Sequence, residues 1–149
     1  MTSIDEKPCG ATPAEEQGMT EEIGRAIAGV ASGEIEAGRL DTAREILQGL
    51  AVSNPYDPAT WAMLAVLERR RGKLLAARVC AETAYRLAPA DDQVRLVRAE
   101  VLLCTPADRK RAAAELRELV PVGGPIAARA AALLTALGAQ IASHGPAPQ

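Results

Sequence analysis

The chain repeats a pattern of residue types every 34 positions. Gly38 is matched by Gly72, and Pro55 is matched by Pro89. The same spacing separates further pairs, which are Val30 and Leu64, Ala31 and Ala65, Ala43 and Ala77, Leu47 and Ala81, Leu50 and Ala84, and Asp57 and Asp91. Because alanine is frequent throughout the chain, the glycine and proline pairs are the more specific evidence. A period of this length is typical of stacked units that each contain two antiparallel helices and a turn.

The repeated residues have the properties that paired helices require. A glycine such as Gly72 can adopt the positive φ with which a chain often leaves a helix. Asp57 followed by Pro58 is typical of a helix start, with an N-cap carboxylate and a proline at the first helical position. Small residues such as Ala65 and Ala84 let two helices approach closely. The sequence predicts helices over residues 20–37, 40–53, 58–71, 74–87, 92–104, 107–120 and 125–142.

The second repeat resembles the tetratricopeptide repeat. It has an early Trp, a Leu and small-residue pair, a turn glycine, further small residues and a closing proline, at Trp61, Leu64, Ala65, Gly72, Ala77, Ala81, Ala84 and Pro89. The third repeat departs from this pattern, because Arg98 stands at the Leu position and Pro106 stands where the glycine would recur. The resemblance implies an all-α fold, a tetratricopeptide-repeat helical solenoid of about three helix-turn-helix repeats plus a C-terminal capping helix.

We therefore expect one folded domain between two tails. The tetratricopeptide-repeat domain is expected over residues 20–142, with repeats at about 24–57, 58–91 and 92–124 and a capping helix at 125–142. Residues 1–19 are expected to be a disordered acidic tail, because acidic side chains outnumber the single Lys7 and proline and glycine interrupt any helix. A solubilising role for this tail is favoured over an autoinhibitory one. Residues 143–149 are expected to be a second disordered tail.

Composition argues against several classes of function. A formal net charge of −2 and an aromatic content of 2% offer neither the basic surplus nor the stacking side chains of a nucleic-acid-binding protein. No apolar run approaches the ~20 residues that span a bilayer, so membrane insertion is not expected. The only histidine, His144, lies in the C-terminal tail and leaves no Ser/His/Asp or Cys/His arrangement. We expect no catalytic residue, hence no enzyme, and no cofactor.

The three cysteines point to a reducing compartment. Cys9, Cys80 and Cys104 are odd in number and widely spaced, which favours neither a disulfide framework nor a metal site. The acidic N-terminus lacks the apolar run of a signal peptide. We expect a cytoplasmic protein without a bound metal.

A groove is the expected working surface. In tetratricopeptide proteins the first helix of each pair lines the concave face, so the resemblance places a peptide-binding groove at Arg25, Ala28, Ser32, Ala62, Val66, Arg69, Arg70, Gln93, Leu96, Glu100 and Leu103, with Ile35, Glu36, Ala59 and Cys104 on the same face. Apolar members would form shallow pockets, and polar members could bond an extended peptide segment. Two alternatives stay open. Leu96 and Leu103 could pack between repeats, and Arg69 and Arg70 could be solvated charges at a helix end.

A narrower resemblance covers part of the chain. The segment from Gly38 to Pro58 resembles class II chaperones of type III secretion, through Gln48, Leu50, Val52, Pro55, Tyr56 and Asp57, and the segment from Arg98 to Leu103 resembles their third repeat. This resemblance implies a cytoplasmic protein-binding chaperone that holds a hydrophobic secretion substrate, such as a translocator, in its concave groove, and it allows a homodimer. The alternative is a general tetratricopeptide adaptor or scaffold in a protein assembly or signalling complex.

Overall fold

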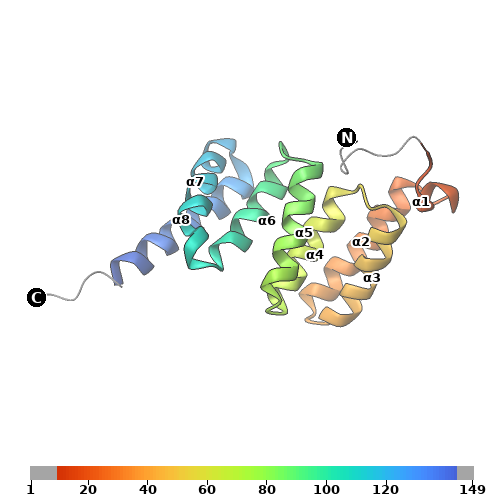
Figure 1. Cartoon of the computed structure of the whole chain (residues 1–149), viewed down its shortest axis with the longest axis horizontal. Helices are drawn as coiled ribbons and strands as arrows, with labels where there is room; N and C mark the ends of the chain where they lie inside the picture. The colour runs from red at the N-terminus through yellow and green to blue at the C-terminus, as the bar shows by residue number, and fades with distance from the viewer. Residues whose placement is uncertain (1–9, 144–149) are drawn as a thin grey trace, which may run out of the picture.

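A computed structural model describes residues 10–143, with side chains described up to Gln140. The fold is all-α and follows the predicted helix pairs (Figure 1). Its α-helices are α1 (Pro13–Glu16), α2 (Glu21–Glu36), α3 (Leu40–Ser53), α4 (Pro58–Arg70), α5 (Leu74–Leu87), α6 (Asp92–Leu103), α7 (Arg109–Leu119) and α8 (Gly124–Ser143). Short 3-10 turns precede and follow α7 at Pro106–Asp108 and Val120–Val122.

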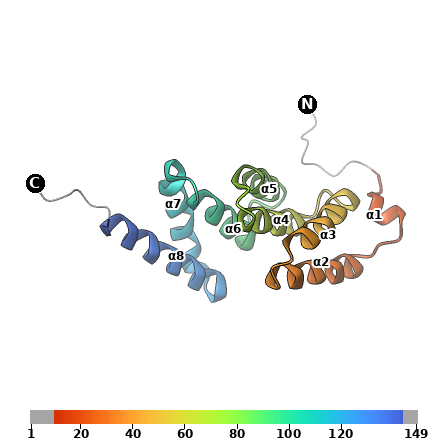
Figure 2. The same cartoon turned by 90° about the horizontal axis from the view of Figure 1, so that it is seen from below.

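The helix pairs stack in chain order into a solenoid, with α1 and α8 at opposite ends of the molecule (Figure 1). The first helices of the pairs touch across repeats, since α2 contacts α4, α4 contacts α6, and α6 contacts α8. These four helices form what we call the inner layer, and α3, α5 and α7 lie behind it (Figure 2). The predicted solenoid of three helix pairs and a capping helix is confirmed.

The 34-residue period is repeated in the backbone hydrogen bonds of the turns. Gly38 and Gly72 have φ values of 78° and 76°, and each donates its N–H at 3.1 Å to a carbonyl near the end of the preceding helix. The residues that follow them donate to carbonyls five residues back, Arg39 to Glu34 and Lys73 to Glu68, both at 2.9 Å. Equal geometry at equal offsets shows that both repeats end their first helix in the same way.

Exchanging Gly72 for Ala tests this turn. A Cβ at positive φ is strained, so Gly72→Ala should lower the free energy of unfolding by about 1 kcal/mol. Gly49→Ala is the matched control, because Gly49 lies inside α3 at an ordinary φ with open space around it. That control should raise stability by about 0.5–1 kcal/mol, since alanine is the better helix former. Urea denaturation measures both, and a stabilised Gly72→Ala would contradict the assigned turn.

Small residues fill the contacts between helices, as the sequence pattern predicts. Ala43, Ala65, Ala77 and Ala84 are all fully buried. They pack with larger side chains such as Leu47 in clusters that run from one repeat into the next. Alanine at these sites lets the helices approach closely, and leucine and valine fill the remaining space.

The N-terminal segment differs from the prediction. Within residues 10–19, α1 is a helical turn closed by a capping box, in which Thr12 Oγ1 accepts from the Glu15 N–H at 3.3 Å and Glu15 accepts from the Thr12 N–H at 2.7 Å. Thr12 and Ala14 are buried, and α1 contacts α3. The expectation of disorder was therefore wrong here, because Pro13 starts the helix instead of breaking it. Residues 1–9 lie outside the described part of the chain, as do 144–149 of the predicted C-terminal tail.

The third pair keeps its place with a different turn. Proline cannot adopt the positive φ of Gly38 and Gly72, and Pro106 instead opens a 3-10 turn that ends at Asp108. The second helix of this pair consequently begins at Arg109, two residues later than predicted. No helix among residues 10–143 is long and apolar enough to cross a membrane.

Candidate functional site

The central groove is a cavity of about 310 Å³ on the inner layer. Three helices and one helix cap contribute to it. Its lining residues are Ser32, Ile35 and Glu36 of α2, Ala59, Ala62, Met63, Val66 and Arg70 of α4, Gln93, Val94 and Val97 of α6, and the capping residue Asp91.

The helical period explains why α4 supplies most of this lining. Its contributing residues recur at intervals of three and four, which places them on one face of the helix. Ala62, Val94 and Val97 are almost fully buried and form an apolar floor, and Val66 is half-buried. The lining of the groove is therefore largely apolar on α4 and α6.

Polar groups stand at the edge of the apolar floor. Glu36, Arg70 and Gln93 are exposed, and Arg70 Nη1 donates to the Ile35 carbonyl at 3.2 Å. The same carbonyl accepts from the Gly38 N–H at 3.1 Å, so the bond from Arg70 is a second one, and it ties the first two repeats together. The carboxylate of Glu36 and the amide of Gln93 are available to bond a peptide backbone.

The predicted groove residues are divided among several places. Five of them, Ser32, Ala62, Val66, Arg70 and Gln93, line the central groove. Arg25 and Ala28 line a separate cavity of about 660 Å³ between the start of α2 and the loop that joins α3 to α4. Three of the remaining four, Arg69, Glu100 and Leu103, line a cavity of about 240 Å³ beside α8.

Leu96 is a core residue. It is 5% exposed and packs with Ala99, Leu116 and Leu119 in the third hydrophobic cluster, to which Leu103 adds a half-buried side chain. Of the two alternatives for Leu96, the structure supports packing between repeats. Contact of α6 with both α7 and α8 accounts for this burial.

Arg69 is not a freely solvated charge. Its Nη2 donates to Glu100 at 3.0 Å, and Arg129 of α8 donates to the other oxygen of the same carboxylate at 2.7 Å. Glu100 is thus held between α4 and α8 by two guanidinium groups. The solvated alternative is wrong for Arg69.

Four lining residues of the central groove were missed by sequence reasoning, namely Met63, Asp91, Val94 and Val97. The spacing of Val94 and Val97 from Gln93 places all three at the start of α6, so the helical period could have found them. Within residues 10–143, no group of three His, Cys, Asp or Glu side chains is arranged to hold a metal ion.

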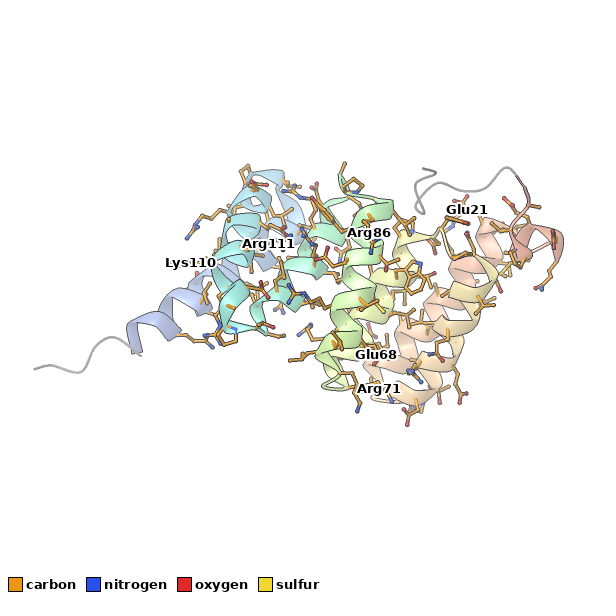
Figure 3. The ribbon with its side chains drawn as sticks, in the orientation of Figure 1. Glu21, Glu68, Arg71, Arg86, Lys110 and Arg111 are labelled. Atoms are coloured by element: carbon orange, nitrogen blue, oxygen red, sulfur yellow. The ribbon has the colours of Figure 1, made fainter. Side chains whose placement is uncertain are left out.

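Cys80 lies near the buried carboxylate of Glu68 and the partly exposed guanidinium of Arg44. The carboxylate of Glu68, 5% exposed, accepts from Arg44 at 2.9 Å and from Arg71 at 3.2 Å, and Figure 3 shows Glu68 and Arg71 together at the end of α4. Burial raises the pKa of the Cys80 thiol, the negative charge of Glu68 adds to this rise, and Arg44 opposes it; together they place the pKa at about 11.

We expect Cys80 to react slowly with iodoacetamide at neutral pH. With a pKa of about 11, the thiolate fraction at pH 8 is on the order of a hundredfold below that of an ordinary thiol. The rate should therefore rise as pH increases toward that pKa. Mass spectrometry of a Cys9→Ser, Cys104→Ser variant isolates this thiol, and the urea-unfolded variant is the control. Equal rates in the folded and unfolded states would show that Cys80 is accessible.

Comparisons with known proteins connect this geometry to solved structures. No protein-family model and no curated protein matches the sequence. The type III secretion translocator chaperone SycD of Yersinia enterocolitica is 18% identical, with 85% of this chain and 98% of SycD covered and a TM-score of 0.73. A type III secretion complex from Aeromonas hydrophila is 19% identical, covering 88% of this chain and 91% of that chain, with a TM-score of 0.71.

A third solved structure contains a bound segment. PcrH, solved in complex with the chaperone-binding region of PopD, is 22% identical, with 83% of this chain and 96% of PcrH covered and a TM-score of 0.67. The described helices and these similarities agree with the tetratricopeptide-like solenoid that the repeat predicts. The chain has the fold of the type III secretion translocator chaperones.

Proposed function

We propose that this protein is a cytoplasmic chaperone that holds an extended segment of a hydrophobic secretion substrate in its central groove. The observation that carries the proposal is an apolar floor with a polar edge, open on the inner layer of the solenoid. A protein of the same fold, PcrH, was solved with the chaperone-binding region of PopD. That likeness supports a polypeptide as the ligand.

The groove suits an extended peptide physically. Alternate side chains of an extended segment point to the same side, where Ala62, Val66 and Val97 offer apolar contact. Each Å² of apolar surface removed from water contributes roughly 25 cal/mol. Glu36 and Gln93 can satisfy backbone groups that would otherwise lose their hydrogen bonds to water. Holding such a segment covers apolar side chains that would otherwise aggregate, and this requires no reaction.

A single charge in the floor tests the groove. Val66→Glu should weaken substrate binding by roughly tenfold to a hundredfold, since a carboxylate replaces apolar contact and must be desolvated. Val79→Glu is the matched control, because Val79 of α5 is 57% exposed and lies outside the groove. Co-expression with a candidate translocator from the same gene neighbourhood identifies the partner. Calorimetry with the purified proteins then gives the affinity of each variant for that partner.

Circular dichroism must show equal helix content for both variants, so that unfolding is not mistaken for lost binding. Parental affinity in a folded Val66→Glu variant would place recognition outside the central groove. A neighbourhood without secretion genes, together with a groove-dependent partner of another kind, would favour the adaptor function.

A further inference from the structure

A second pocket, of about 390 Å³, lies between α7 and α8 and shares no residue with the central groove. We call it the basic pocket. Its apolar part consists of Ala113, Leu134, Leu137 and Gly138, and its basic part consists of Arg109, Lys110 and Arg117. Ala113 and Leu137 are nearly buried, and the three basic residues are exposed.

The positive charge of this region is uncompensated. From residue 109 to 143 the sequence has five basic residues and only two acidic ones, Glu115 and Glu118. Both carboxylates are paired with arginines of α6, because Glu115 accepts from Arg98 and Glu118 accepts from Arg95. No ion pair within residues 10–140 neutralises Arg109, Lys110, Arg111 or Arg117.

The position of these charges is unfavourable for α7 itself. Arg109, Lys110 and Arg111 occupy its first turn, where the helix dipole favours acidic residues, and no acidic residue stands there. Lys110 and Arg111 are labelled in Figure 3. Asp108, the residue just before α7, is paired with Arg78 at 2.8 Å. Helix stability does not explain three cations at this end, whereas an external anionic group would.

The basic pocket continues toward α6. Arg109 and Leu137 also line the cavity beside α8, where Arg69 holds Glu100. The Nε of Arg69 is buried without a hydrogen-bond partner, although most buried donors are paired. A polar acceptor entering this cavity could satisfy it.

We propose that the basic pocket binds an acidic segment of a partner protein that carries one or two large apolar side chains. Leu134 and Leu137 contact the apolar side chains, and Arg109, Lys110 and Arg117 pair with the carboxylates. The described side chains of the pocket include no aromatic ring on which a nucleic-acid base could stack, which favours a polypeptide over single-stranded nucleic acid.

The test uses two labelled peptides of about twelve residues, one repeating Glu-Glu-Leu-Leu and one repeating Lys-Lys-Leu-Leu. Fluorescence anisotropy should show that the acidic peptide binds at least about tenfold more tightly, and that its affinity falls as NaCl rises from about 50 mM to about 300 mM. Lys110→Glu with Arg117→Glu should reverse this preference.

A steric block tests the apolar part. Gly138 lies on α8 with open space around it, so Gly138→Leu should fill the pocket without a clash and weaken acidic-peptide binding by about tenfold. Gly49→Leu on α3 is the matched control and should bind as the parent does. Val66→Glu should also bind as the parent does, so that failure here is distinguishable from failure of the proposed function.

The proposal is overturned by absent binding of the acidic peptide, by equal affinity for both peptides, or by parental affinity in Gly138→Leu. It is also overturned if Val66→Glu loses the acidic peptide, which would place that peptide in the central groove. Equal affinity for a single-stranded oligonucleotide of matched charge would show a general anion-binding surface instead of a peptide site.

Discussion

Replacing Ala84 with Asp is expected to lower the free energy of unfolding by about 3–5 kcal/mol, a large part of the stability of a small domain. Ala84 is fully buried on α5. It belongs to a cluster whose members are all apolar, among them Ala62, Val94 and Val97 from the two neighbouring first helices. A carboxylate there would be desolvated among apolar side chains and would also be too large for the space that alanine occupies.

Ala76→Asp is the matched control for this prediction. Ala76 is exposed in the first turn of the same helix, where the helix dipole favours a negative charge. Thermal melting and urea denaturation compare the two variants. If the melting temperature of Ala84→Asp lay within about two degrees of that of Ala76→Asp, the result would contradict the packing of Ala84 between α5, α4 and α6.

Replacing Arg98 with Ala should lower the free energy of unfolding by an amount similar to that of Ala84→Asp, for a different reason. Arg98 is 4% exposed on α6 and stands 34 residues after Leu64. Its guanidinium donates to Glu82 at 2.9 Å and to Glu115, and it stacks on the Tyr85 ring 4.0 Å from the centroid. Truncation to Ala leaves the carboxylates of Glu82 and Glu115 without their shared cation. Removal of one partner from a buried ion network lowers the free energy of unfolding by about 3–5 kcal/mol.

A double-mutant cycle separates this charge effect from lost packing. Glu115 is the more enclosed carboxylate, with a side chain 18% exposed against 32% for Glu82. Glu115→Gln should destabilise the parent, because it weakens the pair with Arg98. In the Arg98→Ala background the same change should stabilise, because it removes an uncompensated charge. Additive losses in urea denaturation would show that Arg98 acts through packing alone.

Local features were predictable because neighbouring residues determine them. The positive φ of Gly72 and the cap at Asp57 depend on groups within a few positions along the chain, and the structure has both as the pattern predicts. Sequence reasoning missed a local feature at Thr12 and Glu15, whose spacing is that of a capping box.

The groove was predictable only in part. The tetratricopeptide resemblance predicted Ser32, Val66 and Gln93 on one face, and all three line the central groove. It could not show whether a residue on that face is open or covered, because covering depends on helices that are distant in sequence. Leu96 has a groove position by its register, yet it is packed in the cluster that includes Leu116.

The sequence by itself determined the helix pairs, their turns and the small residues between them, since these follow from backbone conformation and helical period. Only the tertiary structure decided which positions remain open, how Arg98 could replace a leucine in the core, and where the charges of α7 gather. The physical reason is that burial and ion pairing are set by partners from other helices. Glu82 and Glu115 lie 16 and 17 residues from Arg98 along the chain, and their contact with it exists only after the repeats have stacked.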